Sequence, residues 1–84
     1  MAKASVILGE VTSGRGRIKF RDLQKLLLKL GFHLDRTRGS HHIYVHPNVT
    51  RALSVQRIGK DAKPYQVRQL ADMIEEFGLE LDDK

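Results

Sequence analysis

Two segments of the chain place apolar residues at steps of three and four, which is the spacing of an amphipathic helix. The first stripe consists of Phe20, Leu23, Leu27 and Leu30, and it predicts a helix over residues 21–30. Gly31 follows directly and supplies the positive φ at which many helices end. A leucine-rich stripe of this kind is expected to pack in the core.

The second stripe begins after Pro64, a residue that fits the first turn of a helix because its missing N–H is not needed there. Its apolar positions are Val67, Leu70, Ala71, Ile74 and Phe77. Gly78 is expected to end this helix. The pattern therefore predicts a second amphipathic helix over residues 64–77.

Between the two helices the pattern changes to alternation with period two, which is typical of strands. Residues 32–37 alternate and predict a half-buried strand, 42–46 are rich in β-branched and aromatic residues, and 52–56 predict a third short strand. The turn between the first two contains Arg38, Gly39 and Ser40, and residues 59–63 are expected to form a polar, basic loop. Short connections favour an antiparallel meander.

The predicted order is α-β-β-β-α, an α+β domain with a three-stranded antiparallel sheet and two helices on one face. The other face of the sheet stays open, and this arrangement resembles the double-stranded RNA-binding fold. Residues 18–84 are expected to form this single domain, with an acidic C-terminal end. Residues 1–17 are expected to be a partly flexible extension, in which residues 6–8 start a strand or a helical turn and 12–17 form a basic loop.

The charge is uneven along the 84 residues, whose net charge is +5. Residues 1–70 hold 14 Lys or Arg and 4 Asp or Glu, a balance of +10, whereas residues 71–84 have a balance of −5. The basic charge of residues 1–70 is consistent with an ordinary solvated surface. The more specific interpretation is a surface that binds phosphates. Cysteine is absent, which excludes disulfides and thiolate chemistry. With no long apolar run and no apolar N-terminal stretch, we expect a soluble cytoplasmic protein.

Three of the four histidines, His41, His42 and His46, lie within six positions. His41 and His42 are expected to point to opposite faces of a strand, and His42 and His46 to share one face. With no cysteine and no acidic residue in that strand, we expect no metal site.

Catalysis by imidazole is the second interpretation of this cluster. His41 follows the turn and lies near Arg36 and Arg38, which could hold a phosphate. Histidine can transfer a proton near neutral pH, and beside RNA it could act on a 2′-hydroxyl or a leaving 5′-oxygen. The residues alone favour the plainer interpretation, a surface histidine that packs on a neighbour or bonds to the backbone.

Three segments together resemble a known family. They are residues 20–32 (FRDLQKLLLKLGF), 38–44 (RGSHHIY) and 63–70 (KPYQVRQL), and they resemble the HicA toxins of bacterial toxin–antitoxin systems. The resemblance implies a ribonuclease that cuts messenger RNA, stops translation and is held inactive by a HicB-type antitoxin covering the active site. The catalytic histidine of the family, the one after Gly-Ser, corresponds to His41. The chain departs from the family at Val55-Gln56, where members often have Val-Pro.

On this interpretation the catalysis needs no metal or cofactor, and RNA is the substrate. The residues expected to contact it are Arg36, Arg38, Gly39, Ser40, His42, Lys60 and Lys63. If His41 transfers one proton, the second proton of the reaction could be handled by His42, a lysine or water. Two alternatives remain: a non-catalytic RNA-binding module of the same fold, and a protein-interaction domain whose acidic end binds a basic partner.

Overall fold

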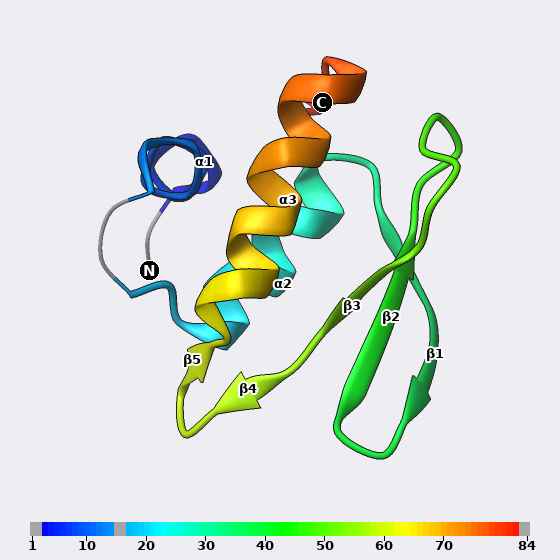
Figure 1. The fold of residues 1–84 in the computed structure, drawn as a ribbon. Helices are drawn as coiled ribbons and strands as arrows, with labels where there is room; N and C mark the ends of the chain where they lie inside the picture. Colours follow the sequence, from blue (N-terminus) through cyan, green and yellow to red (C-terminus); the bar gives the residue numbers. More distant parts are fainter. Residues whose placement is uncertain (1–2, 15–16, 83–84) are drawn as a thin grey trace.

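The computed structural model describes residues 3–14 and 17–82, in which three helices accompany two small antiparallel sheets. In chain order the elements are α1 (Ala4–Ser13), α2 (Phe20–Lys29), β1 (His33–Arg38), β2 (His41–Val45), β3 (Leu53–Val55), β4 (Arg57–Ile58), β5 (Asp61–Ala62) and α3 (Pro64–Phe77). The strands β1, β2 and β3 form one sheet in this order, and β4 pairs with β5 (Figure 1). The predicted α+β class is confirmed, and the order is compatible with the double-stranded RNA-binding fold.

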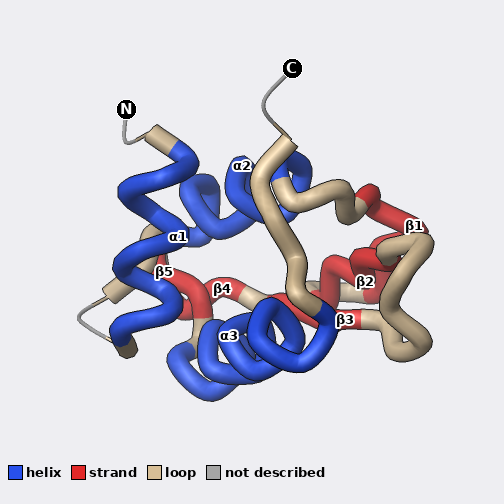
Figure 2. Tube along the Cα trace, turned by 90° about the horizontal axis from the view of Figure 1, so that it is seen from above, coloured by secondary structure: helices blue, strands red, loops and turns tan. Residues whose placement is uncertain are grey.

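The helices gather on one side of the β1–β2–β3 sheet (Figures 1 and 2). The helix α1 contacts both α2 and α3, and α3 contacts β3. In the part of the chain that the structure describes, no helix covers the opposite face of the sheet. The predicted open face is therefore present, and the core lies between the sheet and the helices. None of the described helices is long and apolar enough to cross a membrane.

The helix α2 forms as its apolar spacing predicts. Its buried residues are Phe20, Leu23, Leu26 and Leu27, and Leu30 follows them into the core. Gly31 and Gly78 both have positive φ angles at the ends of α2 and α3, as predicted. The apolar stripe of α2 therefore determined both the position and the orientation of this helix.

The helix α3 has the predicted bounds but a different buried face. Its most buried residues are Gln66, Leu70 and Met73, whereas the predicted stripe residues Val67 and Ala71 are only partly buried. The reason is that Gln66 turns inward to bond with Gln56 before β4. Leu70 of the predicted stripe faces the core beside Gln66 and Met73, and the other stripe residues, Val67, Ala71, Ile74 and Phe77, are partly buried at its flank.

The strand β1 is not half-buried as predicted, because all six of its residues are exposed. It lies at the edge of the sheet, and its register shifts between Leu34 and Arg36, which leaves Asp35 as an extra residue. Leu34 pairs with Tyr44, but Arg36 pairs with Ile43. Since directly paired residues lie on the same face of a sheet, this bulge places Leu34 and Arg36 on opposite faces. The predicted alternation is therefore interrupted inside the strand.

The N-terminal segment contains a helix. The sequence had allowed either a strand or a helical turn at residues 6–8. In α1, Ile7 is 0% and Val11 1% exposed, so both belong to the core. Residues 12 and 13 of the predicted basic loop are helical, and residues 15 and 16 lie outside the described residues. The predicted loop over 59–63 is likewise a hairpin, since β5 (Asp61–Ala62) lies within it. The domain boundary at residue 18 stays a prediction.

Candidate active site on the open sheet face

A two-residue turn, Gly39–Ser40, joins β1 to β2. Gly39 has a φ of 60°, and no described non-glycine residue, Ser40 included, has a positive φ. This is the backbone pattern of a type II′ hairpin turn, which requires glycine at its first central position. The turn pairs Arg38 directly with His41, so the sequence Arg-Gly-Ser-His forms a tight corner with an arginine beside a histidine.

His41 is exposed at the start of β2, on the open face of the sheet. Its side-chain Nδ1 lies 3.0 Å from the Oγ of Ser54 in β3. Ser54 stands between Leu53 and Val55, which are both buried on the helix side. Strand alternation therefore turns Ser54 to the opposite, open face, together with His41.

Ser54 is a candidate site residue that the sequence interpretation missed. A signal was present, because a small polar residue between two apolar ones in a short strand must point away from the core. The predicted meander pairs the second strand with the third, but the sequence did not give the register, which brings Ser54 beside His41.

Arg36 and Arg38 share the open face with His41. Arg38 pairs with His41 and Arg36 with Ile43, and directly paired residues lie on one face. Arg36 is exposed and forms an ion pair of 2.7 Å with the neighbouring Asp35. The structure therefore brings three of the predicted site residues together on one surface, with positive charge along the edge strand.

His42 and His46 point to the helix side of the sheet, as the alternation of β2 predicts. The His42 ring lies edge-on to Phe20, with 5.1 Å between ring centroids, and its Nδ1 donates to the Ser40 carbonyl oxygen at 3.3 Å. His46 lies edge-on to Phe32 and is hydrogen-bonded to the Leu30 carbonyl oxygen. The predicted contact of His42 with RNA stays a prediction, and its hydrogen bond to the Ser40 carbonyl ties it to the turn before His41.

Within residues 3–14 and 17–82, no three His, Cys, Asp or Glu side chains gather in a way that could hold a metal ion.

The remaining predicted residues, Lys60 and Lys63, come from a different element. Lys60 lies in the β4–β5 turn and Lys63 immediately precedes α3. Figure 1 shows that the β4–β5 turn and the β1–β2 turn lie at the same end of the molecule. Arg57 of β4 was missed: its guanidinium lies over the Phe20 ring, 5.4 Å from the centroid. Its basic character directly after the third predicted strand was the available signal.

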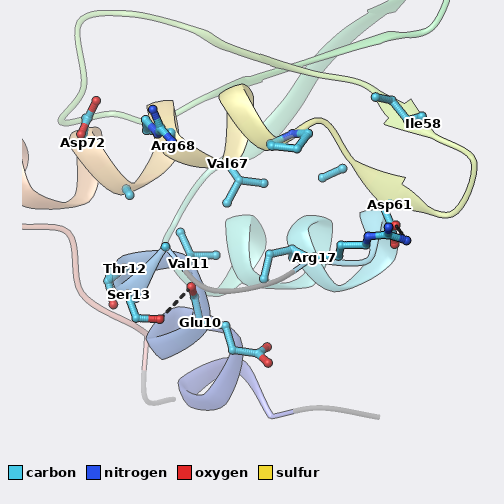
Figure 3. A pocket seen from close by; sticks show the side chains of 15 residues that line it. Glu10, Val11, Thr12, Ser13, Arg17, Ile58, Asp61, Val67, Arg68 and Asp72 are labelled. Atoms are coloured by element: carbon cyan, nitrogen blue, oxygen red, sulfur yellow. Dashed lines mark hydrogen bonds and ion pairs between the residues drawn. The ribbon is translucent and has the colours of Figure 1, made fainter.

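A hollow of about 600 Å³ lies elsewhere, between α1, α3 and the β4–β5 hairpin. Val11, Val67 and Ile58 line it together with charged residues such as Arg68 and Asp72 (Figure 3). None of the predicted site residues lines this hollow. An exposed, basic sheet face is the better surface for a long polyanion, because phosphates are bound by accessible Lys and Arg. We therefore place the candidate site on the open face.

Comparison with known proteins then identifies the family. The sequence profile described as "HicA toxin of bacterial toxin-antitoxin" matches residues 20–79, from the start of α2 to just beyond α3. The matched segment contains the turn, His41 and Ser54, and it leaves α1 outside. No curated protein and no solved structure gives a match. Since the match covers more than two thirds of the chain, this protein belongs to the HicA family of toxins from bacterial toxin–antitoxin systems.

Proposed function

We propose that this toxin is an endoribonuclease that cleaves messenger RNA in the cytoplasm and thereby blocks translation, with His41 as its catalytic base. The observation that carries the proposal is the exposed imidazole of His41 on the open face, hydrogen-bonded to Ser54 and paired with Arg38. An imidazole held by one nitrogen, with positive charge beside it, suits proton transfer next to a phosphate. Membership of the HicA toxin family supports the toxin role directly.

The hydrogen bond to Ser54 supports different tasks for the two nitrogens of His41. When Nδ1–H donates to the Ser54 hydroxyl, Nε2 carries the lone pair and accepts the proton of an RNA 2′-hydroxyl. The 2′-oxygen then attacks phosphorus, the bond from phosphorus to the 5′-oxygen breaks, and a 2′,3′-cyclic phosphate and a 5′-hydroxyl form. The leaving 5′-oxygen needs a proton. We assign that proton to water, because His42 points to the opposite face.

Phosphate binding is assigned to the basic residues around the turn. Arg36 and Arg38 lie on the His41 face, and Lys60, Lys63 and Arg57 extend the positive surface from the neighbouring hairpin. Gly39 and Ser40 form the turn itself, where a missing side chain allows RNA to approach the backbone closely. These contacts orient the scissile phosphate over the histidine.

The test is cleavage of a labelled single-stranded RNA by the wild type, by His41→Ala and by His33→Ala, all in EDTA. His33 is a matched control because it is an exposed histidine of the same sheet, at the far end of β1. We expect His41→Ala to lose about 10²–10⁴-fold in rate, whereas His33→Ala keeps the wild-type rate. A DNA strand of the same sequence should stay intact, because it lacks the 2′-hydroxyl.

Two results would contradict the assignment. Equal cleavage by wild type and His41→Ala would remove His41 from the chemistry. Retention of RNA in a shift assay without cleavage by any variant would instead favour the alternative, a non-catalytic RNA-binding module of the same fold.

The toxin family implies an antitoxin partner, and we propose a HicB-type protein that covers the open face. Diethyl pyrocarbonate modifies accessible imidazoles, so His41 of the free toxin should react. In the complex His41 should be protected and cleavage should stop. Unchanged modification of His41 in an inhibited complex would place the antitoxin on another surface.

A further inference from the structure

The helix α3 contains a buried polar side chain that the proposed mechanism does not use. Gln66 is 2% exposed, and its side-chain amide forms two hydrogen bonds, both to Gln56. The Gln66 Oε1 accepts from the Gln56 backbone N–H at 2.7 Å, and the Gln66 Nε2 donates to the Gln56 Oε1 at 3.2 Å. A buried amide with these partners is costly to replace, because each lost bond leaves a polar group unpaired.

Gln56 extends this connection to the turn before His41. Its Nε2 donates to the Oγ of Ser40 at 3.0 Å, and its carbonyl oxygen accepts from the Lys63 N–H at 3.1 Å. The segment after β3 is therefore bound to the start of α3 on one side and to the β1–β2 turn on the other. Three side chains connect the buried face of α3 to the residue that precedes His41.

The direction of every bond in this connection follows from one group. A backbone N–H can only donate, so the Gln56 N–H requires Oε1 of Gln66, and the Nε2 of Gln66 must then face the Gln56 Oε1. Consequently the Nε2 of Gln56 faces Ser40, whose Oγ accepts. The Ser40 carbonyl oxygen is bound independently by His42. Ser40 is thus held at both its side chain and its main chain, directly before the histidine.

We propose that Gln66 and Gln56 are positioning residues that act through Ser40 to place His41 against Ser54. This inference rests on the proposed function and deepens it, because it identifies what orients the catalytic group. A shift of about 1 Å in a reacting group can cost on the order of 100-fold in rate. We therefore expect a break in this connection to lower kcat by about 10- to 100-fold while KM changes little. Substrate binding should persist because the arginines of β1 are untouched.

The main variant is Gln66→Met, which keeps the length of the side chain and removes both amide bonds. Gln69→Met is its matched control, since Gln69 is an exposed glutamine of the same helix. Ser40→Ala removes the hydrogen bond between Gln56 and Ser40 at the other end of this connection. Because Ser40 is exposed, the substitution does not disturb the core. The measurements are kcat and KM with labelled RNA, the thermal melt, and the nuclear Overhauser contact between the His41 ring and the Ser54 β-protons.

The proposal requires that Gln66→Met and Ser40→Ala both lose at least tenfold in kcat and weaken the His41–Ser54 contact, whereas Gln69→Met matches the wild type. A Gln66→Met protein that melts earlier but keeps kcat and the contact would overturn it and leave Gln66 with a purely structural role. If Gln66→Met does not fold, Ser40→Ala decides by the same criteria. If the wild type cleaves no RNA, the proposed function fails, and the His41–Ser54 contact alone decides the positioning.

Discussion

Replacement of Gly31 by alanine should destabilise this protein more than any ordinary glycine substitution. Gly31 joins α2 to β1 with a φ of 99°, and a Cβ built there would lie 2.9 Å from the Nε2 of His46. That ring cannot move without loss. Its Nδ1 accepts from the Asn48 N–H at 3.0 Å, and its Nε2–H donates to the Leu30 carbonyl oxygen at 2.9 Å.

The expected cost has two parts. A non-glycine residue with a positive φ costs about 1–2 kcal/mol. Displacement of the His46 ring removes a part-buried hydrogen bond to Leu30, which is worth about 0.5–1.5 kcal/mol. The close approach of the new Cβ to the His46 ring adds to these two costs. Gly31→Ala should therefore lose about 2–4 kcal/mol of unfolding free energy. For a domain of this size the melting temperature should fall by roughly 10–25 °C.

Urea unfolding followed by circular dichroism measures this loss, and two other glycines separate its causes. Gly59 has a φ of 61°, and no atom lies within 4 Å of the position that a Cβ would take, so Gly59→Ala measures backbone strain alone. Gly9 lies inside α1 and is equally uncrowded, so Gly9→Ala should stabilise the protein by about 0.5–1 kcal/mol.

From the most to the least stable, the order should therefore be Gly9→Ala, wild type, Gly59→Ala and Gly31→Ala. In a double-mutant cycle, His46→Ala should cost less in the Gly31→Ala background than in the wild type, because the bond to Leu30 is already lost. The reasoning fails if Gly31→Ala is no less stable than Gly59→Ala, or if the two substitutions at 31 and 46 are additive.

Three further predictions follow from the packing and the charges. Tyr44→Phe removes the acceptor of the Gln24 amide and should cost about 1 kcal/mol in urea unfolding; an unchanged midpoint would show that water replaces this bond. Arg38→Gln should reduce the salt dependence of single-stranded RNA binding by about 0.7 in logarithmic slope, whereas Arg51→Gln, in the loop before β3, should not; equal slopes would remove Arg38 from the interface. A shortened chain of residues 18–84 lacks α1 and its two buried side chains, so its unfolding free energy should fall by about 3 kcal/mol or more, and equal stability would show that α1 adds nothing.

The sequence by itself determined the elements whose signals are local. The apolar period of residues 20–30 specifies α2 and its buried face, because a helix places every third or fourth residue on one side. Strand alternation likewise separates His41 from His42, and the Gly-Ser pair predicts the turn that precedes them. These features depend on backbone geometry that neighbouring residues impose, so the sequence is sufficient to predict them.

The tertiary structure decided which side chains meet across distant segments. The register between β2 and β3 brings Ser54 to His41, the bulge at Asp35 turns Arg36 to the open face, and the inward turn of Gln66 changes the buried face of α3. The local pattern turns Ser54 to the open face, but it does not say which side chain Ser54 meets, because each of these contacts depends on a partner at least seven residues away along the chain. Pairing register and the need to satisfy buried polar groups are properties of the assembled core, and they complete the site around a histidine that the sequence had already indicated.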